Sequence, residues 1–300
     1  MVIDPQLVPI LDLFGGELPV VGRAPAEVRA MMSGGAPRSD EGLRVVEDIT
    51  VAGLPARAYR PEGSASAAPG LVYFHGGGWV IGGIASTDAM CAALAADSGV
   101  TVISVDYRLA PEHPFPAAAE DAYAATAWVA EHATELGLDP ARIAVGGDSA
   151  GGNIAAVAAL MARNAGRPAL AFQLLIYPNT DLTMSSRSIK ENGDLRHMLS
   201  QDSLAWFVQH YLGESDPTDW RASPLLADSH AGLPPALVVT ADLDPLVDEG
   251  EAYAAKLQQA GVPTRVERGR NMCHGFYGFP VDETKRVHGV ITVALRAALA

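Results

Sequence analysis

From residue 43 onward the sequence alternates between strand-like and helix-like runs, and this alternation most limits the folds open to the chain. The runs at residues 70–75 and 100–107 are continuously apolar, as expected of strands buried on both faces of a sheet. Helix-like runs occupy residues 86–97, between those two strands, and residues 150–166 farther along. Strands that alternate with helices form βαβ units, so the sequence predicts an α/β fold with a mostly parallel central sheet flanked by helices.

The other elements follow the same pattern. Further strands are expected at residues 142–147, 169–178, 235–242 and 264–270, and further helices at residues 117–136, 251–261 and 284–300. Residues 43–51 and 55–61 alternate in hydrophobicity with turn residues between them, which predicts an antiparallel pair. Ser86 or Thr87 is the expected N-cap of the helix over residues 86–97.

Two segments depart from the alternation. Residues 1–40 consist of short amphipathic pieces interrupted by proline and glycine. Residues 181–221 are polar and hold one helical stretch, residues 203–212, whose apolar face carries Leu204, Phe207, Val208 and Tyr211. An insertion of this length above a parallel sheet is more typical of a lid or cap than of a second domain.

Composition limits the class of protein. A chain of 300 residues that is 49% hydrophobic can bury a sizeable core in one large domain or two small ones. The net charge of -14 argues against nucleic acid and anionic lipid as partners, because no basic excess is present. The N-terminus has no basic segment typical of a signal peptide, and no apolar run reaches the length of about 20 residues that a membrane span needs. We therefore expect a cytoplasmic protein without membrane insertion.

A candidate nucleophile lies in the sequence GGDSAGG at residues 146–152, where G-x-S-x-G centres on Ser149. The motif follows a predicted strand and precedes an Ala-rich helix, which is the context of a nucleophile elbow. There the serine hydroxyl is exposed and the backbone N–H of Ala150 points at the substrate. A glycine-rich turn with a chance serine is the alternative interpretation.

A serine of ordinary pKa needs a base, and the base needs an orienting group. Of the eight histidines, His274 lies in a loop after a late strand, beside Gly275, where the backbone can turn to project the ring. A buried loop histidine with a satisfied hydrogen bond would look the same. The orienting carboxylate is expected at the end of the strand before it, where position leaves Asp242 and Asp244 equally suitable. Asp244 precedes Pro245, so it also fits an ordinary helix N-cap.

Three successive glycines, Gly76 to Gly78, follow the strand over residues 70–75. A dinucleotide-binding G-x-G-x-x-G fails here because Ile81 stands where the third glycine is required, and no Gly-Lys-Ser/Thr of a phosphate-binding loop follows. A tetrahedral oxyanion needs converging backbone N–H donors without side chains in the way, each donor being worth about 3–4 kcal/mol. An oxyanion hole is therefore predicted, with a tight turn as the alternative.

Several stretches together resemble one family, the bacterial hormone-sensitive-lipase-like esterases, which are α/β-hydrolases marked by HGGG and GDSAG. The matching stretches are HGGGW at residues 75–79, DYRLAPE at 106–112, GDSAGG at 147–152, DPLVDEG at 244–250 and HGF at 274–276. They cover about residues 40–300 in the family's order, and serine, aspartate and histidine follow the chain order of α/β-hydrolases. Val247 stands where the family usually has arginine, which should alter the surroundings of the acid more than its role.

The resemblance implies roles for individual residues. By position, Ser149 is the nucleophile, His274 is the base, and Asp244 rather than Asp242 is the orienting acid. The implied oxyanion donors are Gly77, Gly78 and Ala150. No metal and no cofactor are implied, and the sequence holds no C-x-x-C or H-E-x-x-H motif.

The resemblance also implies an organisation, with residues 41–300 as an α/β-hydrolase catalytic domain covered by a helical cap. Residues 1–40 would form the N-terminal part of that cap and residues 181–221 its insertion. The cap contains apolar side chains that could line an acyl pocket, namely Met31, Met32, Met184, Met198, Trp206 and Phe207. A homodimer is plausible by family analogy.

The expected function is that of a serine carboxylesterase that hydrolyses short- to medium-chain carboxylic esters through an acyl-enzyme. Its partner would be a small-molecule ester. A non-catalytic ligand-binding protein on the same fold is one alternative. A serine amidase or peptidase, which shares the Ser-Asp-His triad, is another.

Overall fold

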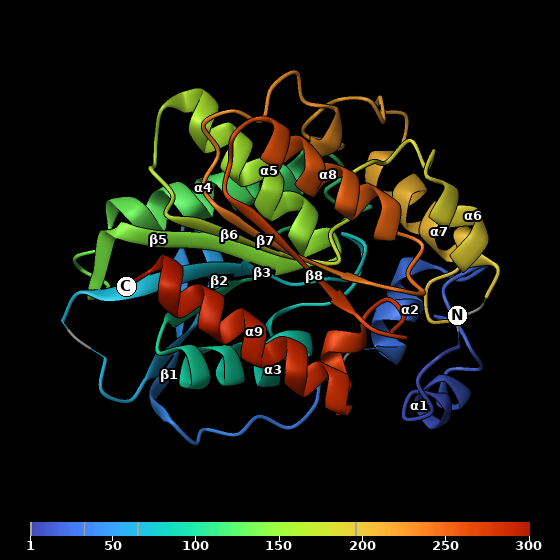
Figure 1. Cartoon of the computed structure of the whole chain (residues 1–300), viewed down its shortest axis with the longest axis horizontal. Coiled ribbons are helices and arrows are strands. Elements are labelled where there is room, and N and C mark those ends of the chain that lie inside the picture. Colours follow the sequence, from blue (N-terminus) through green and yellow to red (C-terminus); the bar gives the residue numbers. More distant parts are fainter. Residues whose placement is uncertain (1, 33, 65, 196) are drawn as a thin grey trace.

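The computed structural model describes residues 2–32, 34–64, 66–195 and 197–300, and in them a single eight-stranded sheet runs through the molecule (Figure 1). Met1 and Ser33, within the expected cap range 1–40, and Arg196, within 181–221, lie outside the described residues. The strand order is β1-β2-β4-β3-β5-β6-β7-β8. The α/β fold with a mostly parallel sheet is confirmed.

Each expected strand is present. The strands are β1 (Leu43–Val51), β2 (Leu54–Pro61), β3 (Ala68–Phe74), β4 (Thr101–Val105), β5 (Leu138–Asp148), β6 (Phe172–Ile176), β7 (Ala236–Ala241) and β8 (Thr264–Gly269). β2 pairs antiparallel with both β1 and β4, and the pairs from β4 onward are parallel. Every residue of β4, β6 and β7 is buried, which explains their largely apolar sequences.

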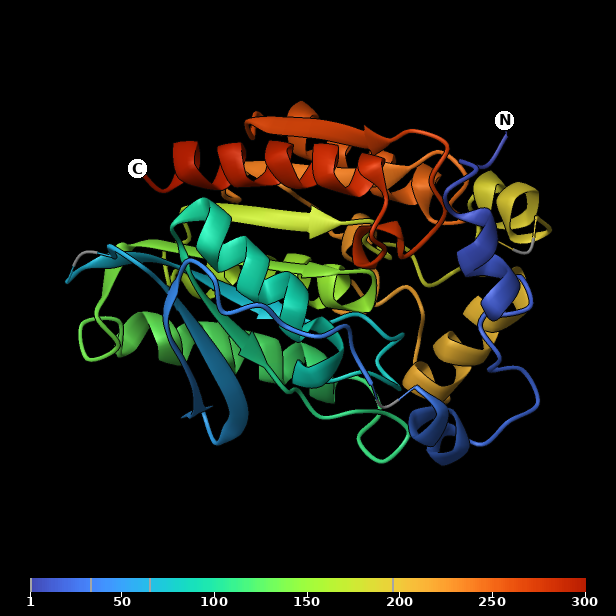
Figure 2. The same ribbon diagram turned by 90° about the horizontal axis from the view of Figure 1, so that it is seen from below.

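Helices cover both faces of the sheet. They are α3 (Ile84–Ser98), α4 (Ala117–Glu131), α5 (Ala150–Ala165), α8 (Val247–Gln259) and α9 (Asp282–Ala298), with short 3₁₀ turns η1 (Pro224–Leu226) and η2 (Phe276–Gly278). Figure 2 shows α3 and α9 together on one face, whereas α4, α5 and α8 lie on the other in Figure 1. Two hydrophobic clusters, one on each side of the sheet, result from this layering.

The two segments outside the alternation meet at one end of the molecule. The N-terminal segment (residues 2–32) contains α1 (Val8–Leu13) and α2 (Pro25–Met31), and the insertion segment (residues 181–221) contains α6 (Arg187–Gly193) and α7 (Gln201–Leu212). They lie side by side near the carboxyl ends of the parallel strands (Figures 1 and 2).

Backbone hydrogen bonds connect the two segments. The N–H of Leu18 donates to the carbonyl of Met198 at 2.8 Å, and the N–H of Met198 donates to Gly16 at 2.8 Å. The indole N–H of Trp206 also reaches the carbonyl of Arg23 at 3.3 Å. These bonds join residues that lie 180 or more positions apart in the sequence.

The helix predicted over residues 203–212 is confirmed as part of α7, and its expected apolar face is buried, comprising Leu204, Phe207, Val208 and Tyr211. The prediction of only one helical stretch in the insertion was wrong, because α6 is also present. Its sequence, RSIKENG, has no apolar period, since little of it is buried beyond Ser188 and Ile189. Such a short helix depends on tertiary contacts rather than on its own sequence.

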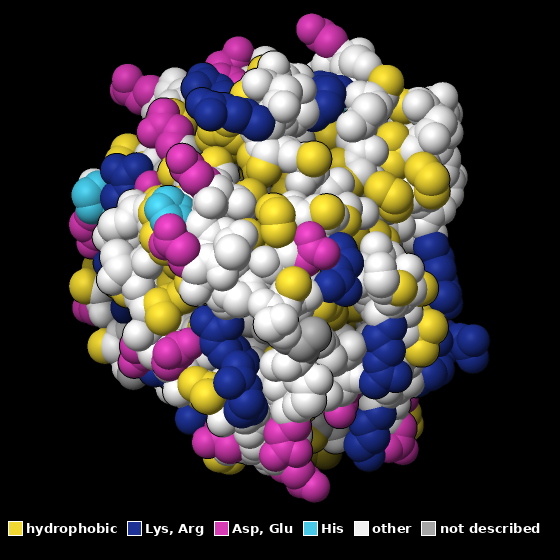
Figure 3. Space-filling view, turned by 90° about the vertical axis from the view of Figure 1, so that its left-hand side faces the viewer, with side chains coloured by type: hydrophobic (Ala, Val, Ile, Leu, Met, Phe, Trp, Pro, Cys, Tyr) yellow, Lys and Arg dark blue, Asp and Glu magenta, His cyan; other side chains and the backbone are white. Residues whose placement is uncertain are grey.

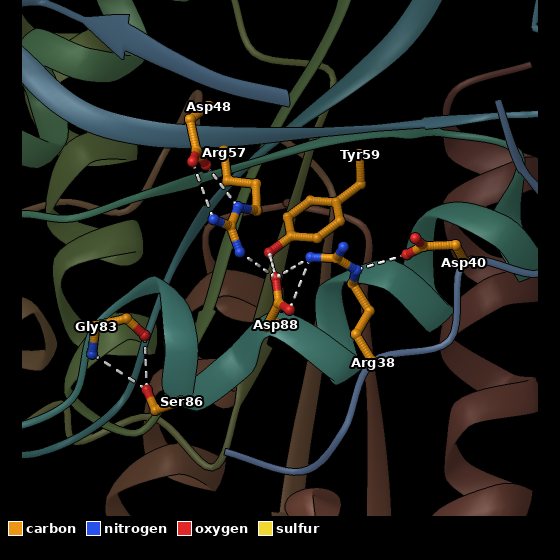
Figure 4. A network of polar contacts seen from close by, with 8 residues as sticks. All are labelled: Arg38, Asp40, Asp48, Arg57, Tyr59, Gly83, Ser86 and Asp88. Carbon is orange, nitrogen blue, oxygen red and sulfur yellow. Dashed lines mark hydrogen bonds and ion pairs between the residues drawn. The ribbon is translucent and has the colours of Figure 1, made fainter. Parts of the chain in front are cut away.

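The predicted N-cap of α3 was also wrong. Gly83 occupies that position, and the helix starts two residues earlier than expected. Ser86 lies at the third helical position, where its hydroxyl accepts from the N–H of Gly83 at 3.1 Å and donates to the carbonyl of Gly83 at 2.7 Å (Figure 4). The serine therefore stabilises the helix start from inside the first turn.

A network of charged side chains attaches α3 to the chain around β1 and β2 (Figure 4). The carboxylate of Asp88 on α3 accepts from Arg38 at 2.9 Å, from Arg57 at 2.9 Å and from the hydroxyl of Tyr59 at 2.6 Å. Burial alone would raise the pKa of Asp88, but these hydrogen bonds lower it below its usual range. The carboxylate is therefore ionised in the folded protein and joins α3 to β2 and to the loop before β1.

The face of the molecule drawn in Figure 3 carries both signs of charge. On the face drawn in Figure 3, acidic and basic side chains are interspersed with scattered hydrophobic ones. The net charge of -14 is therefore not gathered into one field on that face. Among the described residues, no helix combines the length and hydrophobicity that crossing a membrane requires.

Replacing Asp88 by asparagine should lower the free energy of unfolding by about 2 kcal/mol at neutral pH, because two guanidinium groups lose a mostly buried charged acceptor. The folded-state pKa of Asp88 is depressed, so its contribution is present above the unfolded-state pKa and is lost as the pH falls through the folded-state value. The difference between wild type and Asp88→Asn should therefore shrink in strong acid. Urea unfolding at several pH values measures it, with the exposed Asp40→Asn as a control that should change stability little. An equal effect of both substitutions would contradict the argument.

Candidate active site

Ser149 occupies the sharp turn between β5 and α5, with φ of 55° and ψ of -120°. A positive φ costs a non-glycine residue free energy, so the surrounding structure must hold it. The N–H of Ser149 donates to the carbonyl of Ile176 at 2.8 Å. A Cβ on Gly151 would overlap the carbonyl oxygen of Phe74 at the end of β3, and the space at Gly147 is equally closed. The flanking glycines are therefore required because neighbouring backbones approach closely.

His274 lies beyond β8, in the loop that precedes η2, and its side chain is buried against Ser149. Its Nε2 atom is 2.8 Å from Ser149 Oγ, and its Nδ1 atom is 2.8 Å from Asp244 Oδ2. A carboxylate accepts hydrogen bonds, so the contact with Asp244 favours the tautomer that carries its proton on Nδ1. Nε2 is then free to accept the proton of the serine hydroxyl.

The structure separates the two aspartates between which sequence position could not choose. Asp244, 1% exposed, gives one oxygen to His274 and the other to the N–H of Leu246 at 2.8 Å. Asp242 instead accepts from the N–H of Asn271 at 2.8 Å and lies 3.5 Å from Arg268. Asp244 is not the N-cap of α8, because Leu246 occupies that position. Of the two, Asp244 is the one that lies against His274.

The three glycines belong to a loop, here called the glycine loop (residues 75–83), that follows β3 and reaches the same place. Gly77 and Gly78 have φ of 117° and 56° and line a cavity together with Ser149, Ala150 and His274. A Cβ on Gly77 would overlap the carbonyl of Ile81, and one on Gly78 would overlap the ring of Phe207. Both Gly77 and Gly78 must therefore lack a side chain, the first because of the loop's own backbone and the second because of Phe207.

Asp148 supports the glycine loop from beneath, a role that sequence reasoning missed. Its Oδ1 accepts from the N–H of Gly76 at 3.0 Å and from the hydroxyl of Tyr73 at 2.9 Å. Burial raises the pKa of the Asp148 carboxyl group. In the sequence, the only indication of a role for Asp148 is its position next to Ser149 in GGDSAGG. That position does not reveal which residues of another loop it contacts.

The DYRLAPE stretch holds the start of the glycine loop through His75. His75 Nδ1 is 2.7 Å from the carbonyl of Gly76, and burial lowers the pKa of the ring. The ring of Tyr107 stacks on it with centroids 4.3 Å apart, and the Tyr107 hydroxyl donates to the carbonyl of His75 at 2.9 Å. The loop over residues 106–112 therefore packs beneath the start of the glycine loop.

The cavity over Ser149 has a volume of about 320 Å³. Its apolar lining comes from both segments outside the alternation and includes Phe14, Leu18 and Met32 of the first and Met198, Leu204 and Phe207 of the second. The ring of Tyr177, 4.8 Å from the ring of His274, forms part of its floor. The site can hold an apolar group next to a serine, an imidazole and bare backbone amides.

Of the six side chains expected to line an acyl pocket, three line the cavity and the other three do not. Met32, Met198 and Phe207 line the cavity, whereas Met31, Met184 and Trp206 do not belong to its described lining. Met31 is 55% exposed, and Trp206 packs between the two segments. Phe14 and Leu18 were missed because the N-terminal segment has no period that would show which side chains point inward.

Other histidines serve local structure. His132 Nδ1 is 2.9 Å from the carbonyl of Trp128, His210 Nδ1 is 2.7 Å from that of Trp206, and His230 Nε2 is 3.0 Å from that of Pro224. Throughout the residues that the structure describes, no group of three or more His, Cys, Asp or Glu side chains is arranged to hold a metal ion.

Comparison with known sequences agrees with this geometry. A family profile described as alpha/beta hydrolase fold matches residues 71–278. The carboxylic ester hydrolase LipN of Mycobacterium tuberculosis is 48% identical over 77% of this chain, although the match spans only 64% of LipN. The carboxylesterase NlhH of the same organism is 45% identical over 82% of this chain and 79% of its own length. An ethyl acetate hydrolase of Pseudomonas putida is 42% identical, with 74% and 71% covered.

Solved structures extend the likeness to the whole chain. A hyperthermophilic esterase from the archaeon Pyrobaculum calidifontis superimposes with a TM-score of 0.91 at 40% identity, covering 100% of both chains. The carboxylesterase EstE1, cloned from a metagenomic library, gives a TM-score of 0.86 at 41% identity, covering 93% of this chain and 99% of its own. The chain therefore belongs to the alpha/beta hydrolase fold family, as one of its hormone-sensitive-lipase-like carboxylic ester hydrolases.

Proposed function

We propose that this protein hydrolyses small carboxylic esters with Ser149 as nucleophile, His274 as general base and Asp244 as orienting acid. The observation that carries the proposal is the unbroken row of hydrogen bonds from Ser149 Oγ through His274 to Asp244, with both distances 2.8 Å. A nucleophile, a base and an orienting carboxylate in that order make up the Ser-His-Asp arrangement of acyl transfer.

In the first half-reaction, Ser149 Oγ attacks the ester carbonyl while His274 Nε2 takes the hydroxyl proton. The carbon–oxygen double bond opens to a tetrahedral oxyanion, and Asp244 stabilises the imidazolium that has formed. When the intermediate collapses, His274 returns the proton to the departing alkoxide and the alcohol leaves. Water then attacks the acyl-enzyme with His274 again as base, which releases the acid and restores Ser149.

The oxyanion requires donors on the side of Ser149 that faces the glycine loop. The amides of Gly77, Gly78 and Ala150 are the proposed donors, because these residues line the cavity at Ser149. Ala150 begins α5, so the positive end of the helix dipole points at the same place. Each such donor is worth about 3–4 kcal/mol of transition-state stabilisation.

The N-terminal and insertion segments together are proposed to act as a cap. They supply much of the apolar lining of the cavity, and hydrogen bonds join them at Leu18 and Met198. A volume of about 320 Å³ lies at the small end of ligand pockets. This supports a preference for esters with short to medium acyl chains.

Two other functions share this architecture. A non-catalytic binding protein would not need a base aligned with the serine, whereas here the row of hydrogen bonds is complete. A fluorophosphonate probe that failed to label Ser149 in the folded protein would favour that alternative. An amidase or peptidase would have the same triad, and it is separated from an esterase by comparing ester and anilide substrates of equal acyl chain.

Substituting Ser149 or His274 by alanine should lower kcat for a p-nitrophenyl ester by roughly three or more decades, because either change removes the activated nucleophile. Purified variants with unchanged thermal unfolding are compared in initial-rate assays. Near-normal hydrolysis by Ser149→Ala would refute the proposed mechanism.

Asp244→Asn should reduce kcat by a factor on the order of a thousand or more, because the amide no longer holds the imidazole in the required tautomer. Asp242→Asn is the matched control two residues away and should change kcat by less than about threefold, since its contacts lie outside the site. The two variants are assayed side by side, and equal losses would argue against Asp244 as the orienting acid.

A series of p-nitrophenyl esters tests the chain-length preference. We expect kcat/KM to be highest for butyrate or hexanoate and to fall for long chains that exceed the cavity. Spontaneous hydrolysis is subtracted by using Ser149→Ala as the blank. Faster turnover of long-chain triacylglycerol than of a butyrate ester would contradict the proposal.

A further inference from the structure

Arg29, on α2 of the N-terminal segment, reaches the far side of the glycine loop. Its Nε donates to the carbonyl of Val80 at 2.7 Å, and its Nη2 donates to the carbonyl of Ala110 at 2.6 Å. The N–H of Ala110 in turn donates to the carbonyl of Trp79 at 2.9 Å. One guanidinium group therefore bridges the glycine loop and the DYRLAPE loop where their backbones already meet.

Glu112 fixes the orientation of this guanidinium group. Its two carboxylate oxygens accept from Arg29 Nη1 at 2.8 Å and Nη2 at 2.7 Å. The hydrogen bond from Arg29 is the main reason why the pKa of Glu112 falls to about 2. A planar fork that serves one carboxylate and two carbonyls at once is a task for arginine, and a lysine ammonium group cannot reproduce it.

The bridged part of the loop determines where the glycine amides point. The N–H groups of Val80 and Ile81 both donate to the carbonyl of Gly77, at 3.1 and 2.9 Å, and so close a tight turn. The carbonyl of Val80, at the exit of that turn, is the one that Arg29 holds. A shift of Val80 would move Gly77 and Gly78 with it.

The insertion segment also contacts the glycine loop. The ring of Phe207 packs against Gly78 without room for a Cβ, and the ring of Tyr211 stacks on Trp79 with centroids 4.4 Å apart. The turn thus contacts both α7 and α2. The contacts from α7 are ring contacts with little directional preference, whereas Arg29 makes directional hydrogen bonds.

We propose that Arg29 is a positioning residue that holds the glycine loop in the conformation that receives the oxyanion. This inference rests on the proposed function, in which the amides of Gly77 and Gly78 are oxyanion donors. Arg29 is not among the described residues that line the cavity, so it acts through the loop and not on the substrate. Activity then depends on the N-terminal segment being docked, even for a small ester that hardly touches it.

Arg29→Ala and Arg29→Lys test the proposal, with Arg23→Ala as the matched control. Arg23 belongs to the same segment, but its guanidinium contacts Met31 Sδ at 3.8 Å rather than the loop. For Arg29→Ala we expect kcat for a p-nitrophenyl butyrate to fall about tenfold to a hundredfold, less than the loss of an oxyanion donor itself, with KM changed by less than about threefold. Arg29→Lys should retain only part of the activity, and Arg23→Ala should match wild type.

The inhibition constant of a trifluoromethyl ketone with a butyl chain distinguishes a positioning role of Arg29 from a purely structural one. Its adduct with Ser149 carries an oxyanion, so its inhibition constant should rise in proportion to the loss of kcat/KM. Guanidinium chloride below denaturing concentrations should partly restore activity to Arg29→Ala and leave the other variants unchanged. Because rescue requires folded protein, it also separates mispositioning from unfolding, which thermal melts check independently.

Three results would overturn the proposal. Unchanged kcat and inhibitor affinity in Arg29→Ala would show that the loop holds its conformation without the bridge. A rise in KM alone would place Arg29 in substrate binding, and a loss without guanidinium rescue in a variant that melts like wild type would rule out positioning through this contact. Failure of the proposed function is a different outcome, because wild type itself would then lack esterase activity or Ser149→Ala would retain it.

Discussion

The close approach of the backbones of β3, β5 and α5 around Ser149 is the constraint on which the rest of the structure depends. α5 begins so near the end of β3 that Gly151 has no room for a Cβ beside the carbonyl of Phe74. This contact forces the strained turn at Ser149 and brings the loop after β3 beside it. The carboxyl ends of parallel strands lie along one edge, so the loops after β7 and β8 deliver Asp244 and His274 to the same place.

Around this contact, successive groups of residues hold the loops of the site in place. Asp148 accepts a hydrogen bond from the N–H of Gly76, and the ring of Tyr107 stacks on that of His75 at the start of the glycine loop. The N-terminal and insertion segments supply apolar lining to the cavity, and Arg29 joins the first of them to the glycine loop by directional hydrogen bonds. Each layer uses polar contacts between segments that are distant in sequence, which is how a fixed geometry is kept in a catalytic centre.

Local sequence was informative wherever the chemistry depends on adjacent residues. The alternation of apolar strands and helices predicted the sheet, because period and burial are local consequences of the fold. GGDSAGG predicted the turn at Ser149, since its glycines and its serine are neighbours in the chain. One failure was of the opposite kind, because α6 has no apolar period of its own and depends on tertiary contacts. The N-cap of α3 was a local error, since Gly83 lies only three residues before Ser86.

The sequence alone was sufficient to predict the fold class, the turn that presents Ser149 and the region that holds the proposed base and acid. The resemblance to a family favoured Asp244 over Asp242, but only folding brings Asp244 within 2.8 Å of His274. Tertiary structure alone decided the lining by Phe14 and Leu18, the partners of Asp148 and the bridge by Arg29. The physical reason is that these contacts join segments tens of residues apart, and their directions depend on how the loops pack rather than on any local period.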